Sequence, residues 1–159
     1  MEVVKGTVCV TGGTGFIPSW LIKRLLEEGY FVRTTVRPNP GNKRDLSFLT
    51  NIVDLNDPDR FNTAIEGSKG VFHIATPVDY EYKESEEIIT EREISGTLCI
   101  LKACLKSETV KRVVYTSSAS TVVHSGQDSD MVDESFWSDV DFFREKETPS
   151  FLSYSIFKT

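Results

Sequence analysis

Long apolar runs are missing from the sequence, and none approaches the roughly 20 residues that a helix needs to cross a bilayer. The chain also lacks the charged-then-apolar leader of a secreted protein. We therefore expect a cytoplasmic protein without a membrane span.

Cysteine and histidine are scarce, with three and two residues. Cys99 and Cys104 share no face of the helix predicted around them, and Cys9 falls in a predicted strand, so we expect buried small side chains rather than a disulfide or a zinc site. His73 follows an apolar pair and is expected to be a hydrogen-bonded core residue. His124 falls in a polar loop, and no metal site is expected.

An excess of positive charge is also missing. The chain carries 18 Lys and Arg against 24 Asp and Glu, a net charge of -6, which argues against nucleic acid or an anionic membrane as the main partner. A length of 159 residues corresponds to about one domain, and we predict a single domain over residues 1–159.

A glycine-rich turn stands out among the features that are present. An apolar run over residues 7–10 leads into Thr11-Gly12-Gly13-Thr14-Gly15-Phe16-Ile17, and an apolar repeat of helical spacing follows over residues 17–28. Backbone N–H groups at the start of a helix bind anions, and the usual ligand of such a glycine turn is the pyrophosphate of a dinucleotide. Glycine turns also occur for steric reasons alone, so this reading depends on the rest of the chain. The predicted cofactor-binding residues of the turn are Thr11, Gly12, Thr14, Gly15, Phe16 and Ile17.

Pro18 is a flaw in the glycine spacing. Proline is tolerated in a first helical turn, but its ring adds bulk where a third glycine would let helix and strand approach closely. We expect weaker cofactor binding and an intact fold.

Strand and helix patterns alternate along the chain. Strands are predicted at residues 7–10, 31–36, 52–54, 70–74 and 112–116. Helices are predicted at residues 17–28, 44–49, 58–65 and 86–106, with one further helical turn near 140–144. Such alternation with short connections predicts an α/β fold, a doubly wound parallel sheet with helices on both faces.

Two regions carry more specific expectations. In the long helix, one face is expected to hold Ile89, Ile94, Leu98, Leu101 and Leu105. Between residues 118 and 153 the pattern breaks down into a polar, acidic and aromatic connection, and the terminal helix is expected to be about one turn long.

Basic residues follow the second strand, where a sheet of this kind that prefers NAD carries an acidic one. Arg37 occupies that position, and Lys43 and Arg44 come shortly after it. A guanidinium suits a 2′-phosphate, so the pattern favours NADP(H). A solvated basic patch is the alternative.

A second group of residues has catalytic character. Ser118 follows the strand at 112–116, and ligands of open α/β sheets bind beyond the carboxyl ends of strands. Tyr154 and Lys158 are four residues apart, so a helix brings them to one face, where the ammonium favours the phenolate and makes the phenol a usable acid.

The chain resembles the extended short-chain dehydrogenases/reductases of plant phenolic metabolism, the family of dihydroflavonol 4-reductase and vestitone reductase, over essentially its whole length. The motifs that carry the resemblance are residues 8–17, 43–51, 71–77, 115–120, 133–139 and 154–158.

The resemblance implies a Rossmann fold and an NADPH-dependent carbonyl reductase that acts on a flavonoid or related phenolic molecule. It implies that Tyr154 donates the proton, that Lys158 holds the nicotinamide ribose and that Ser118 hydrogen-bonds the substrate carbonyl. Further cofactor contacts are implied for Arg37, Arg44, Asp54, Leu55, Ile74, Ala75 and Thr76. The oligomeric state is not implied.

Four departures from the family pattern set the alternatives. Pro18 stands where most relatives have glycine. About ten residues that relatives carry are missing between Asn51 and Asp54, which predicts a stunted third strand. Relatives also continue for about as long again, so we expect a truncated fold without the carboxyl-terminal substrate domain. Val123 stands where dihydroflavonol reductases carry an asparagine, which disfavours that substrate class. The chain is thus expected to be weakly active or inactive alone, and a non-catalytic nucleotide-binding fragment or a pseudo-enzyme is the alternative.

Overall fold

The computed structural model describes residues 5–36, 58–76, 85–127, 129–146 and 149–159. The elements are β1 (Thr7–Val10), α1 (Phe16–Glu27), β2 (Phe31–Thr34), α2 (Pro58–Ile65), β3 (Gly70–His73), α3 (Glu86–Lys106), β4 (Arg112–Tyr115), the 3-10 helix η1 (Ala119–Thr121), α4 (Val140–Lys146) and α5 (Pro149–Lys158). The strand and helix predicted at residues 52–54 and 44–49 lie outside the described residues.

The four described strands form one parallel sheet in the order β2-β1-β3-β4. In its register, Val8 stands beside Val32 on one side and Gly70 on the other. The chain therefore proceeds outward from β1 in one direction to β2 and in the other from β3 to β4. This change of direction marks a doubly wound sheet, whose ligands bind at the carboxyl ends of the strands.

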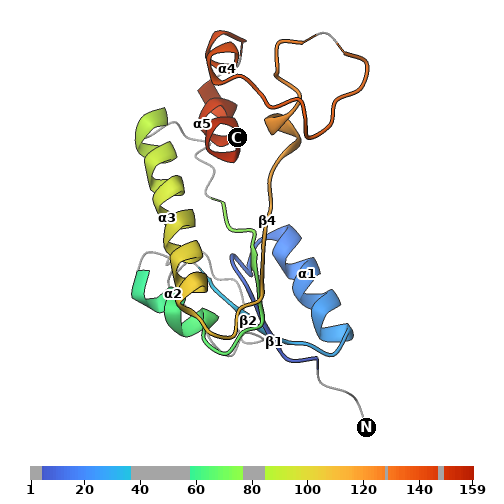
Figure 1. Ribbon diagram of the computed structural model, residues 1–159, viewed down its shortest axis with the longest axis vertical. Coiled ribbons are helices and arrows are strands. Elements are labelled where there is room, and N and C mark those ends of the chain that lie inside the picture. The colour runs from blue at the N-terminus through green and yellow to red at the C-terminus, as the bar shows by residue number, and fades with distance from the viewer. Residues whose placement is uncertain (1–4, 37–57, 77–84, 128, 147–148) are drawn as a thin grey trace. The chain divides into compact units, whose positions relative to one another are not determined.

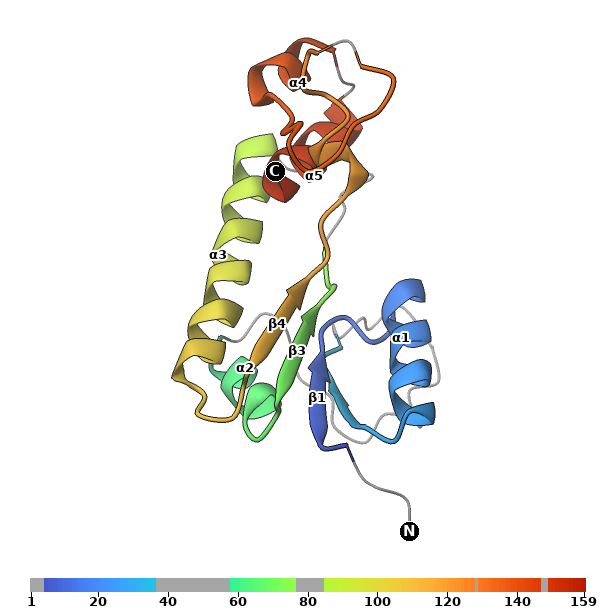
Figure 2. The ribbon, with the colours of Figure 1, turned by 45° about the vertical axis from the view of Figure 1, so that its right-hand side comes forward.

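Helices cover both faces of the sheet, with α1 on one and α2 and α3 on the other (Figures 1 and 2). The alternation of β1 explains this arrangement, because successive side chains of a strand point to opposite faces. Val8 and Val10 pack with Ile22 and Leu25 of α1. Cys9 packs in the opposite cluster, whose other buried members are Phe61, Ala64, Ile65, Val71, Ile100, Ala103 and Cys104. The predicted fold class is thus confirmed.

The chain divides into two compact units. The first, called the sheet unit, comprises Met1–Thr76 and Gly96–Thr116, and the second, called the helical unit, comprises Pro77–Ser95 and Ser117–Thr159. Helix α3 contributes its carboxyl-terminal half to the sheet unit and its amino-terminal half to the helical unit. The single domain expected over the chain stays a prediction.

Helix α3 does not bury the face expected from its leucines. Of the five residues predicted to share one face, Ile89 is buried, whereas Ile94, Leu98, Leu101 and Leu105 are exposed. On α3, the sheet unit instead buries Ile100, Ala103 and Cys104. Leu98, Leu101 and Leu105 lie outside that contact.

The connection after β4 is held by side-chain hydrogen bonds. The Ser138 hydroxyl donates to Ser120 O (2.8 Å) and accepts from His124 N–H (3.1 Å), which joins the segments on either side of the loop. Asp133 Oδ1 accepts from the Ser135 N–H at 2.9 Å, and Asp139 Oδ1 caps α4 by accepting from Asp141 N–H at 2.8 Å. The acidic and serine residues of motif 133–139 therefore form turns and a helix cap.

The terminal helix is longer than expected. Helix α5 covers ten residues from Pro149 to Lys158 instead of one turn. Pro149 is its first residue, a position where proline is favourable because its fixed φ suits the helix and its missing N–H would have no partner there. The extra turns support Tyr154 and Lys158 within a continuous helix.

No helix in the described part of the chain is long and apolar enough to cross a membrane.

Candidate functional site

The glycine turn after β1 is tied to the end of β2. The Gly12 N–H donates to Thr35 Oγ1 (3.2 Å), and the Gly13 N–H donates to Thr35 O (2.9 Å). Gly12 has a φ of 74°, and an added Cβ would lie 3.1 Å from the Cα of Ala75. Glycine is therefore required at position 12 both for its conformation and for the close approach to the chain after β3.

The turn closes onto the start of α1. Gly15 N–H donates to Gly12 O at 2.8 Å, and an added Cβ on Gly15 would stand 3.2 Å from the ring of the buried Pro18. The proline ring thus fills space beside the turn, as expected from its bulk. The first N–H groups of a helix, here those of Phe16 and Ile17, have no partners within the helix and are suited to bind an anion.

Thr11 joins the ends of β1 and β3. Its Oγ1, in a residue only 1% exposed, accepts from the N–H groups of Ile74 (3.0 Å) and Ala75 (2.9 Å). Because both lone pairs are then used, the hydroxyl donates to His73 Nδ1 (2.9 Å). This assigns the ring proton of His73 to Nε2, which lies 3.3 Å from Thr97 Oγ1. His73 is buried and hydrogen-bonded, as predicted.

Replacing Thr11 by valine is expected to lower the free energy of unfolding by about 2 kcal/mol, because two backbone N–H groups and a ring nitrogen lose their partner while the side-chain shape is kept. Urea denaturation measures the change. Thr7→Val is the control, because it makes the same change on the same strand. Equal stabilities of the two variants would contradict the role given to the Thr11 hydroxyl.

The remaining predicted cofactor residues fall into two groups. Ile74, Ala75 and Thr76 follow β3 and are half-buried, and the side chains of Phe16 and Ile17 are exposed. The residues expected at the adenosine end lie outside the described residues. They are Arg37, Arg44, Asp54 and Leu55.

Ser118 stands at the start of η1 in the helical unit. Its Oγ accepts from the Ser120 N–H (3.2 Å) and from the Ser120 hydroxyl (2.9 Å). These contacts use the two lone pairs of the Ser118 oxygen and leave its own proton to be donated to another acceptor. A substrate carbonyl oxygen is such an acceptor.

Helix α5 carries the other two predicted catalytic residues and contacts η1. Tyr154 is half-buried, and its ring meets that of Phe157 edge-on at 5.5 Å. Lys158 is only 5% exposed. Burial lowers the pKa of Lys158 from its usual 10.5 to about 8, and the negative charge of Glu93 opposes that shift. The structure therefore brings Ser118, Tyr154 and Lys158 into one compact unit.

The cysteines do not form a reactive site. All three are free, with Cys9 and Cys104 buried and Cys99 half-buried. Burial, with a smaller effect of Cys104, raises the pKa of Cys9 to about 12, so its thiol stays protonated near neutral pH. Within the described ranges, no cluster of His, Cys, Asp and Glu is suited to hold a metal ion.

Two residues were not predicted from the sequence. Thr35 holds the glycine turn through its hydroxyl and carbonyl, and the signal was a threonine pair at the end of the second strand. Glu93 acts on Lys158 from a distant part of the chain, and no spacing in the sequence relates the two residues.

Comparison with known proteins gives consistent matches. Residues 9–143 match the model of the 3-beta hydroxysteroid dehydrogenase/isomerase family. Vestitone reductase of Medicago sativa is 53% identical over 98% of this chain and 51% of its own length. Dihydroflavonol 4-reductase of Callistephus chinensis is 47% identical over 96% of this chain and 44% of its own length. The chain thus spans about half the length of the curated relatives it matches.

Solved structures agree with the observed fold. The crystal structure of vestitone reductase from alfalfa has a TM-score of 0.79 and 49% identity, over 98% of this chain and 49% of that one. Yeast methylglyoxal/isovaleraldehyde reductase Gre2, solved with NADPH, has a TM-score of 0.74 at 23% identity, which shows a shared fold.

Proposed function

Because the chain belongs to the 3-beta hydroxysteroid dehydrogenase/isomerase family, we propose that it is the nucleotide-binding part of an NADPH-dependent carbonyl reductase for flavonoid-type molecules. The observation that carries the proposal is the placement of Tyr154 and Lys158 one turn apart on α5, which contacts the short helix begun by Ser118. The similarity to vestitone reductase and dihydroflavonol 4-reductase supports the substrate class. We place the protein in the cytoplasm.

The glycine turn is proposed to bind the pyrophosphate of a dinucleotide. An added Cβ at Gly12, Gly13 or Gly15 would meet atoms of the protein itself at 3.2 Å or less, so the turn is packed tightly in the sheet unit. The N–H groups of Phe16 and Ile17 at the start of α1 would hold the phosphate oxygens. Arg37 and Arg44 are proposed to bind the 2′-phosphate that distinguishes NADPH.

Each catalytic residue has a separate task in the proposed reaction. NADPH supplies a hydride to the carbonyl carbon when it is bound. Ser118 donates its proton in a hydrogen bond that orients the carbonyl oxygen. Tyr154 transfers its phenolic proton to that oxygen, and the ammonium of Lys158 stabilises the negative charge left on the phenol.

The substrate is proposed to be closer to vestitone than to a dihydroflavonol. Vestitone reductase is the more similar of the two named relatives, at 53% against 47% identity. Val123 offers no hydrogen bond to a phenolic hydroxyl, whereas the asparagine expected there in dihydroflavonol reductases does. We propose no nucleic-acid partner.

The experiment compares the wild type with Tyr154→Phe. NADPH is expected to raise the melting temperature of both proteins, because a ligand that binds only the folded state stabilises it. Reduction of vestitone, followed by NADPH absorbance, is expected to fall at least about 100-fold in Tyr154→Phe, since general acid catalysis contributes that much. Tyr30→Phe is the control, because Tyr30 lies in the sheet unit under the ammonium of Lys69.

Different outcomes separate the alternatives. An unchanged melting curve with NADPH would overturn the cofactor assignment. Equal reduction rates of the wild type and Tyr154→Phe would remove Tyr154 from the mechanism. NADPH binding without any turnover would identify a nucleotide-binding module in place of a reductase.

A further inference from the structure

Lys158 sits in surroundings that disfavour its charge. It lies in the last turn of α5 and is 5% exposed. Transfer of an ammonium out of water is costly unless an opposite charge or hydrogen bonds compensate it. A residue that supplies negative charge from a fixed position would therefore decide the protonation state of Lys158.

One face of α3 is turned toward the helices that surround Lys158. Glu86 Oε1 lies 3.7 Å from a guanidinium nitrogen of Arg144 on α4, and α4 contacts α5. Thr90, one turn further along α3, has its hydroxyl oxygen buried. The amino-terminal turns of α3 lie beside α5 in both ribbon views (Figures 1 and 2).

Glu93 belongs to this face of α3. It follows Glu86 by seven residues, which is nearly two full turns, and so returns to the same side of the helix. Its side chain is half-buried, and its negative charge acts on the ammonium of Lys158. All of these residues belong to the helical unit, so their arrangement does not depend on how the two units are placed.

We propose that Glu93 is a positioning residue that keeps Lys158 protonated for its part in the proposed reaction. The inference rests on the proposed function for its purpose, because both tasks of Lys158, binding ribose hydroxyls and favouring the phenolate of Tyr154, require the ammonium form.

Arg144 on α4 pairs with Glu86 and with Asp141, and neither ion pair involves Lys158. Helix η1 contains only Ala119, Ser120 and Thr121, none of which carries a charge. On α5 itself, Tyr154 lies one turn before Lys158. Glu93 is the carboxylate that opposes the effect of burial on the pKa of Lys158.

The test follows the titration of Lys158 directly, by NMR of protein labelled with 13C at lysine Cε. The signal is assigned by its loss in Lys158→Arg. The wild type is expected to titrate at about 8. In Glu93→Gln the midpoint is expected to fall by about one unit, the size of effect that a nearby opposite charge exerts. Glu93→Asp, which keeps the charge, should titrate between these two proteins.

Glu91→Gln is the matched control, because Glu91 is an exposed carboxylate on the same helix. An unchanged midpoint in Glu93→Gln, or an equal shift in Glu91→Gln, would overturn the inference. If Glu93→Gln does not fold, the comparison of Glu93→Asp with the wild type decides, since a shorter carboxylate must still move the midpoint downward.

Failure of this inference differs from failure of the proposed function. The titration needs neither cofactor nor turnover, so it tests the effect of Glu93 on Lys158 even in a chain that reduces nothing. NADPH titrations at several pH values supply the functional readout. In Glu93→Gln, the loss of NADPH binding on the alkaline side should move to lower pH by the same shift.

Discussion

Gly13→Ala is expected to lower the free energy of unfolding by about 3 kcal/mol, at the upper end of the cost of overpacking. An added Cβ would lie 2.2 Å from Thr34 Oγ1 and 2.8 Å from Thr34 Cγ2. Thr34 cannot turn away freely, because it is buried and its hydroxyl donates to Val10 O at 2.7 Å. Any shift of the turn itself would break the hydrogen bond from Gly13 N–H to Thr35 O.

Urea denaturation measures the loss of stability in Gly13→Ala and in two reference variants. Gly96→Ala is the matched control, because Gly96 lies inside α3 and, among the described residues outside its own helical turn, no atom would lie within 4 Å of an added Cβ. Its helix should gain up to about 1 kcal/mol. Adding Thr34→Ala to Gly13→Ala should recover part of the loss, since the two closest atoms are then removed. A Gly13→Ala protein as stable as the wild type would refute the crowding argument.

The same substitution tests whether the turn binds a cofactor. The Gly13→Ala protein that remains folded is expected to bind NADPH more weakly, because the start of α1 is displaced with the turn. Gly96→Ala should bind NADPH as the wild type does.

The sheet and the glycine turn were predictable because their signals are local. The alternation of Val8, Cys9 and Val10 and the glycines after them specify a buried strand that leads into a helix. The family match is confirmed for the same reason, since its motifs are short and contiguous. The use of Thr11 and Thr35 as hydrogen-bonding supports was not predicted, because their partners are far from them in the sequence.

For two helices, the sequence pattern alone was not enough to predict the buried face or the length. Helix α3 carries two apolar stripes, and the sequence alone does not tell which one faces the sheet. The stripe with Leu98 and Leu105 is exposed, and the stripe with Ile100 and Ala103 is buried. The length of α5 was underestimated because Pro149 was taken as part of a loop, although proline is favourable at the start of a helix.

The candidate catalytic residues were identified from their spacing, but their surroundings were not. The positions of Tyr154 and Lys158 on one helix follow from a separation of four residues. The burial of Lys158 and the charge of Glu93 arise from contacts between segments far apart in the chain. These contacts determine the protonation of the site, so its pH dependence becomes visible only in three dimensions.

Lys158→Met is expected to stabilise the protein while it weakens NADPH binding. Burial of the ammonium lowers the pKa of Lys158 from 10.5 to about 8 in the folded state. Below about pH 8 the lysine is protonated in both the folded and the unfolded chain, and the cost of burying the charge is fully present. Methionine has a similar length and no charge, so at pH 7 it should raise the free energy of unfolding by up to about 3 kcal/mol.

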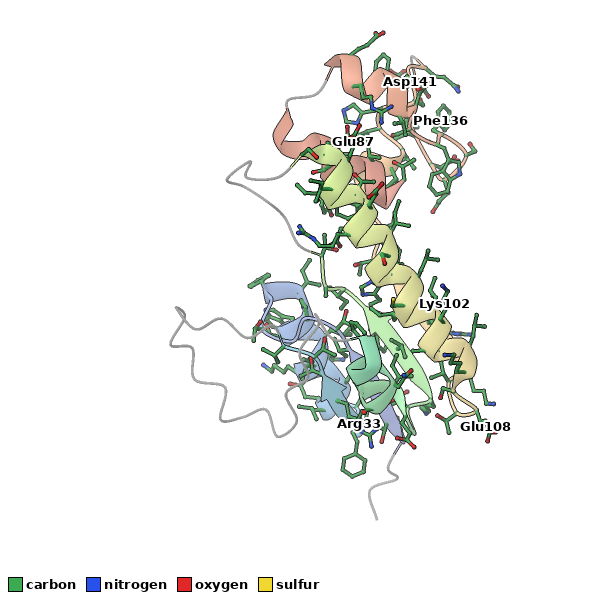
Figure 3. All side chains as sticks on the ribbon, turned by 90° about the vertical axis from the view of Figure 1, so that its left-hand side faces the viewer. Arg33, Glu87, Lys102, Glu108, Phe136 and Asp141 are labelled. Carbon is green, nitrogen blue, oxygen red and sulfur yellow. The ribbon has the colours of Figure 1, made fainter. Side chains whose placement is uncertain are left out.

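The pH dependence of the free energy of unfolding tests the direction of this effect. Between about pH 8 and pH 10.5 the unfolded chain binds more protons at Lys158 than the folded one, so the stability of the wild type should rise with pH relative to Lys158→Met. The two curves should therefore converge at high pH. Lys102→Met is the control, because it makes the same change at an exposed lysine of α3 (Figure 3). Parallel curves for the wild type and Lys158→Met would show that the buried lysine carries no such cost.

A stabilised Lys158→Met protein with weaker NADPH binding would show that this lysine is kept at the expense of stability, which is expected of a functional residue and not of a structural one.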